Sequence, residues 1–161
     1  MSAQGVFILV NAFGGLVVLG GYGWCLTAYP EYRTDLWGGV HGGLKLLFTI
    51  SMAIAASGYL TFAYVSLIQQ GLDGFGKGFW GGPYTVGILS LGFLLSASVW
   101  MPSTIAYIQT GLIRWWIILV LSLWLTSLFL LLITLLVSFS TRENISDFSH
   151  YSATAGLAYI T

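Results

Sequence analysis

The chain has 161 residues, of which 57% are hydrophobic and 6% are charged, whereas about a quarter of an ordinary soluble domain is charged. Five Lys and Arg balance five Asp and Glu, so no basic surface is available for nucleic acid, and we expect no nucleic-acid partner. A single cysteine excludes an internal disulfide and any paired-cysteine metal or redox site.

The first predicted membrane span covers residues 5–29 and ends before Pro30, which cannot continue a helix. Asn11, Gly14 and Gly21 fall at helical spacing on one face, which is small and slightly polar. Such faces let another backbone come close, so we expect this face to pack inside a helix bundle. Asn11 also needs a hydrogen-bond partner at membrane depth, and a carbonyl or hydroxyl of a neighbouring helix would supply one.

The second predicted span covers residues 44–68 and follows a glycine-rich loop that holds His41. Ala53 and Ser57 form a small-xxx-small pair on one face of this span, which predicts a second helix-packing surface. Lys45 lies at the beginning of the span, where its long side chain can reach the lipid headgroups.

The third predicted span covers residues 83–109, and Gly92 and Ser96 continue the pattern of small residues. Pro102 removes one helical hydrogen bond, so the helix either bends there or stops and leaves the following residues at the interface. We favour a helix that continues with a kink, because apolar residues still follow Pro102.

The fourth predicted span covers residues 115–140, which contain no charge and are apolar on every face. At 1.5 Å per residue this helix would be about 39 Å long, against about 30 Å for the hydrocarbon core of a bilayer. The short turn before it predicts that the third and fourth spans are antiparallel neighbours. The tail, 141–161, is too short and polar to span, and residues 153–160 are expected to form a brief interfacial helix or a strand against a partner.

These elements predict an all-α integral membrane protein, a single domain of four transmembrane helices with short loops and a short polar C-terminal tail. An even number of spans places both termini on the same side of the membrane. The sequence does not indicate which membrane the protein occupies.

Candidate chemistry is sparse in this sequence. Within the four predicted spans, the only ionisable side chain among Asp, Glu, Lys, Arg and His is Lys45, at the edge of its span, which disfavours proton-coupled carriers. His41 is a candidate haem or chlorophyll ligand, although an interfacial histidine in a flexible loop explains it more simply. We therefore expect no enzyme activity, no metal site and no strongly indicated cofactor.

The leading functional hypothesis is an accessory or assembly subunit of a membrane complex, which contacts the lipid bilayer and packs against other membrane proteins or copies of itself. One alternative is a channel or carrier for a neutral or apolar solute, which would use the cleft beside Asn11 and the Pro102 kink. A third is a pigment- or haem-binding subunit that uses His41.

Overall fold

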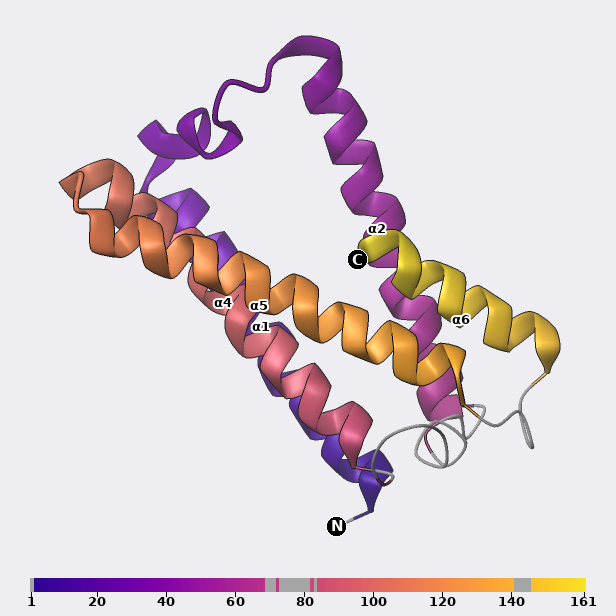
Figure 1. The fold of residues 1–161 in the computed structure, drawn as a ribbon. Coiled ribbons are helices and arrows are strands. Elements are labelled where there is room, and N and C mark those ends of the chain that lie inside the picture. Colours follow the sequence, from indigo (N-terminus) through magenta and orange to yellow (C-terminus); the bar gives the residue numbers. More distant parts are fainter. Residues whose placement is uncertain (1, 69–71, 73–81, 83, 141–145) are drawn as a thin grey trace.

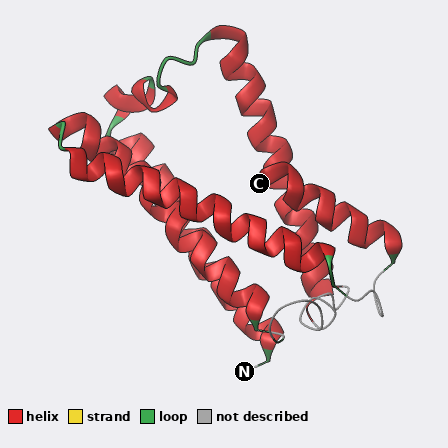
Figure 2. Cartoon of the chain, viewed as in Figure 1, coloured by secondary structure: helices red, strands yellow, loops and turns green. Residues whose placement is uncertain are grey.

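The computed structural model of the protein describes residues 2–68, 72, 82, 84–140 and 146–161. Within these residues the chain consists of helices joined by turns and loops, with no strand (Figure 2). The elements are α1 (Ala3–Ala28), η1 (Pro30–Arg33), η2 (Asp35–Trp37), α2 (Gly42–Ile68), α4 (Thr85–Thr110), α5 (Ile113–Ser138) and α6 (Asp147–Ile160).

Four of these helices, α1, α2, α4 and α5, are long and apolar enough to cross a membrane. Each has 26 or 27 residues, and a rise of 1.5 Å per residue makes them about 39–40 Å long. The prediction of an all-α membrane protein with four spans is confirmed. The helices begin and end within two residues of the predicted boundaries, although the predicted first residue of the third span, Pro83, lies outside the described residues.

The helices form two groups that meet at one end of the molecule (Figure 1). In one group α4 packs against both α1 and α5, and in the other α6 packs along α2. The main hydrophobic core lies where the groups meet, and α1, α2, α4, α5 and α6 each contribute to it a residue with no exposed surface. These residues are Phe7, Phe62, Val86, Ile133 and Leu157.

The first part of α2 lies apart from the other spans (Figure 1). Residues 42–50 are all exposed, and Leu44, Leu46 and Leu47 each leave at least 60% of their surface uncovered by the chain. The second part of α2 carries its buried residues, Phe62, Val65 and Ser66. The contacts that α2 makes with the other α-helices therefore lie between Ser51 and its end, and its first turns lie outside them.

The tail forms a helix rather than a strand, and this helix begins earlier than the sequence suggested, at Asp147. Ser146 caps it by accepting a hydrogen bond from Ser149 N at 3.3 Å. Instead of lying apart at the interface, α6 packs beside α2 and also contacts α5. α6 therefore lies alongside two membrane-spanning helices, although it is too short to cross a membrane itself.

Pro102 lies inside α4, which continues past it to Thr110 as predicted. The helix ends at Gly111, whose φ of 64° is left-handed and therefore suits glycine. Gly111 N donates to Tyr107 O at 2.8 Å, and α5 begins at Ile113. This tight turn makes α4 and α5 adjacent helices that run in opposite directions (Figure 1).

Candidate functional site

Gly14 brings α1 close to α4. A Cβ at this position would lie 2.7 Å from Leu94 Cδ1 and 3.0 Å from Leu94 Cβ, so only glycine fits without a shift of Leu94. One heptad further on, Gly21 makes no such contact, because a Cβ there would meet nothing within 4 Å. The predicted packing face of α1 therefore contacts α4 at Gly14, whereas Gly21 lies beside open space.

A hydrogen-bonded pair of aromatic residues links α1 to α4 beyond this glycine contact. Tyr22 Oη donates to the carbonyl of Ala97 at 2.9 Å, and Trp100 Nε1 donates in turn to the Tyr22 hydroxyl. The two rings meet edge to face, with centroids 5.5 Å apart. At membrane depth this arrangement satisfies both polar groups with protein partners, which orients α1 against α4.

Gly92 and Ser96 face α5. A Cβ on Gly92 would lie 2.5 Å from Phe129 Cζ, so the phenyl ring occupies the space that a side chain would need. One turn later the hydroxyl oxygens of Ser96 and Thr126 are 2.9 Å apart. The fit of Phe129 over Gly92 and a hydroxyl pair thus hold the α4–α5 hairpin together.

Asn11 belongs to a polar junction of α1, α2 and α4. Tyr59 Oη donates to Asn11 Oδ1, and Asn11 Nδ2 donates to the Phe7 carbonyl at 2.8 Å. The Ser90 hydroxyl is fully buried and has no well-formed hydrogen bond, although it lies near enough to Tyr59 to interact with its hydroxyl. This junction connects α2 to the other spans through side-chain polar groups.

The closest approach between α2 and α6 joins two glycines. A Cβ on Gly58 would lie 2.7 Å from Gly156 O, and one on Gly156 would lie 2.8 Å from Gly58 Cα. The hydroxyls of Ser51 and Tyr159 are 2.9 Å apart further along the same interface. Backbone-to-backbone contact of this kind is typical of tightly packed membrane helices.

Ala53 and Ser57 are exposed and lie on the side of α2 opposite its buried residues. Ser57 Oγ donates to the Ile54 carbonyl at 2.7 Å, so its hydroxyl is satisfied within its own helix. The chain therefore leaves the predicted small face of α2 open, and α6 packs on the other side.

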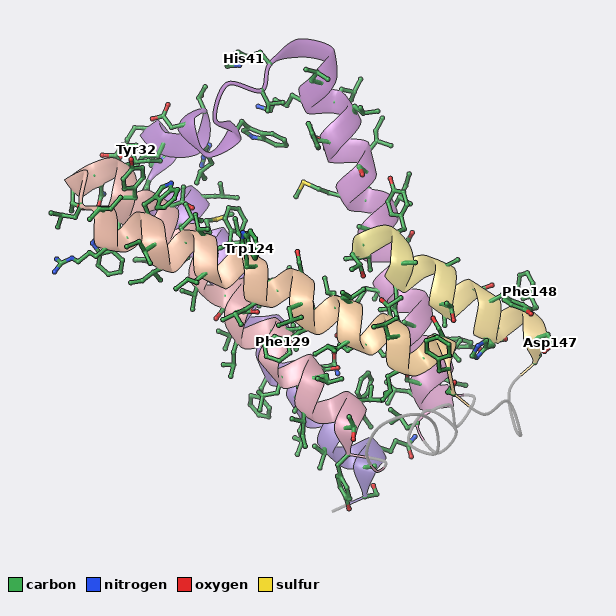
Figure 3. The ribbon with its side chains drawn as sticks, in the orientation of Figure 1. Tyr32, His41, Trp124, Phe129, Asp147 and Phe148 are labelled. Atoms are coloured by element: carbon green, nitrogen blue, oxygen red, sulfur yellow. The ribbon has the colours of Figure 1, made fainter. Side chains whose placement is uncertain are left out.

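His41 is exposed in the segment between η2 and α2. The second histidine, His150, is buried in the first turn of α6, and Figure 3 places Asp147 and Phe148, which belong to the same turn, far from His41. The described residues contain no group of three His, Cys, Asp or Glu that could hold a metal ion. The two histidines are therefore not brought together.

Comparison with known proteins found no matching family model, no matching curated protein and no matching solved structure.

Proposed function

We propose that this chain is a non-enzymatic subunit of a membrane complex and that it binds a transmembrane helix of another chain through the open small face of α2. The proposal rests on the position of the exposed residues of this face. The face consists of Thr49, Ala53, Ala56, Ser57 and Leu60.

The contrast between α2 and α5 supports this proposal. On α5 the exposed positions are mostly large and apolar, as lipid-facing positions usually are, and they include Leu121, Leu125, Leu128, Leu131 and Leu135. The exposed surface of α2 also includes large apolar residues, such as Leu46, Ile50 and Ile54, but beside them runs a strip of Ala, Ser and Thr, which are the residues enriched where membrane helices touch. Small residues offer lipid chains little surface to pack against, whereas they let the backbone of a second helix come close.

The incomplete packing of α2 agrees with this role. Its first nine residues, 42–50, are exposed, and within the described residues α2 packs extensively only against α6. A helix of another chain that packs along the open face would also contact α2 near its first turn. Either a second copy of this chain or a different membrane protein can supply that helix.

The test is gentle extraction of the tagged protein from its native membrane, followed by native mass spectrometry. We expect the wild-type chain to carry a stoichiometric partner and the double variant Ala53→Leu/Ala56→Leu to bind it about 10- to 100-fold more weakly, because two leucines overpack the contact. Ala12→Leu is the matched control, since Ala12 is an exposed residue of α1. A wild-type chain that is purely monomeric, or a double variant that keeps its partner, contradicts the proposal.

A further inference from the structure

A groove of about 440 Å³ opens where the end of α1, the second half of α4 and the start of α5 come together. Trp24, Tyr29 and Trp115 line it and lie near the ends of their helices, where aromatic side chains mark the membrane interface. From Gln109 the groove reaches along α4 as far as Ser98, which corresponds to about 16 Å of helix. A volume in this range suits a small ligand.

The lining of the groove selects for an uncharged molecule. Among the described residues no Asp, Glu, Lys, Arg or His lines it, and its wall includes Val99, Ile105, Ala106 and Ile118. A charged headgroup would lose its hydration here without gaining a counterion. The occupant must therefore be largely apolar and neutral.

Two polar groups in the groove lack their usual partners. The Ser98 carbonyl would normally accept a hydrogen bond from the N–H four residues later, but that residue is Pro102, which has none. The Ser103 side chain is 97% buried, lines the groove, and has no hydrogen-bond partner among the described residues. A hydroxyl group has the chemistry that both call for, because it can donate to a carbonyl and accept from a serine.

A transmembrane helix is too large to fill this space. A helix about 10 Å across with a pitch of 5.4 Å occupies roughly 420 Å³ per turn, so the groove would hold a single turn at most. A flexible hydrocarbon chain instead fits along the full length of the groove and can enter it sideways from the bilayer.

We propose that this groove binds a neutral lipid alcohol, with the hydroxyl seated at the Ser98 carbonyl and Ser103 Oγ and the hydrocarbon chain along α4. Pro102 has a specific part in this site, because it leaves an acceptor available where an unbroken helix would have none. Ser103 supplies the second polar contact.

The experiment uses two photoreactive probes on the full-length protein in lipid nanodiscs. One probe is a medium-chain alcohol that carries a diazirine, and the other is the matching hydrocarbon without the hydroxyl. We expect the alcohol to label residues of the groove at least roughly fivefold more than the hydrocarbon, and unlabelled alcohol to compete with it.

Three variants and one control separate the hydroxyl contact from the apolar groove. Pro102→Ala restores an N–H for the Ser98 carbonyl and should bring the alcohol-to-hydrocarbon ratio toward one while hydrocarbon labelling persists. Ser103→Ala should lower the ratio, whereas its control Thr104→Ala should not, because Thr104 Oγ1 bonds to the Trp100 carbonyl and does not line the groove. Ala106→Trp should reduce labelling by both probes.

Equal labelling of the wild-type protein by both probes would overturn the proposal, as would labelling that maps outside the groove. An alcohol preference that survives in Pro102→Ala and Ser103→Ala would also overturn it. Because Pro102→Ala replaces a helix-breaking residue with a strong helix former, loss of folding does not explain a negative result.

Discussion

Gly58 and Gly156 meet backbone to backbone, and this contact positions α6 along α2. A Cβ added to either glycine would lie 2.7–2.9 Å from backbone atoms of the other glycine, and backbone atoms cannot rotate away. Neither glycine belongs to a turn, and each lies within a helix. Their role is therefore close approach rather than backbone freedom.

The first prediction concerns this contact. Replacing Gly58 or Gly156 with alanine should destabilise the protein by about 1–3 kcal/mol, because the added methyl group forces the two helices apart. Thermal unfolding in detergent measures the loss. Gly23→Ala on α1 is the control, since a Cβ there would meet nothing within 4 Å. A Gly156→Ala protein as stable as this control would show that α6 does not pack as described.

The second prediction separates two glycines of α1. Gly14→Leu should lower the unfolding temperature, because its Cβ alone comes within 2.7 Å of Leu94. Gly21→Leu should leave the temperature unchanged or raise it slightly, because the space around Gly21 is open and leucine favours a helix over glycine. Equal losses for both variants would mean that α1 is rotated relative to α4.

The third prediction tests the polar junction. Tyr59→Phe removes the hydroxyl that donates to Asn11 Oδ1 and should cost about 0.6–2 kcal/mol, the usual range for a hydrogen bond between membrane helices. A double-mutant cycle with Asn11→Leu measures the coupling, and the two losses should not add, because both changes remove the same bond. Additive losses would show that the two side chains act separately.

The fourth prediction concerns the orientation of the helices. In a Cys25→Ser background, cysteines introduced at Ser2 and Ser146 should react with a membrane-impermeant maleimide from the same side of sealed vesicles. A cysteine at Gly39, between α1 and α2, should react only from the other side, because α1 and α2 each cross once. Reaction of positions 2 and 146 from opposite sides would exclude four crossings.

Much of the fold was predictable because span length is a local property. A long uncharged run has no alternative in a bilayer to a helix that satisfies its own backbone, so all four spans could be located from the sequence. The short link through Gly111 likewise made α4 and α5 neighbours.

The direction in which each face points was harder to predict, because it depends on partners that are distant in the sequence. Ala53 and Ser57 suggested a packing face on α2, but Gly58 lies on the side that meets α6. The tail carries Asp147 and His150, so its polarity concealed the small residues that fit against α2. Tyr22 and Tyr59 were also missed as hydrogen-bonding residues, because their partners, the Ala97 carbonyl and Asn11, are 75 and 48 positions away in the sequence.

The pairing of α2 with α6 also sets the earliest time at which these two helices can dock. Ser51 and its partner Tyr159 are 108 positions apart, and a ribosome adds about 5–20 residues per second, so roughly 5–20 s separate their synthesis. Throughout that interval α2 exists without the helix that covers Gly58, while the α4–α5 hairpin can already close from local contacts. The docking of α6 on α2 therefore waits for α6 to be translated, and α2 remains accessible to insertion factors and to other newly made helices until then.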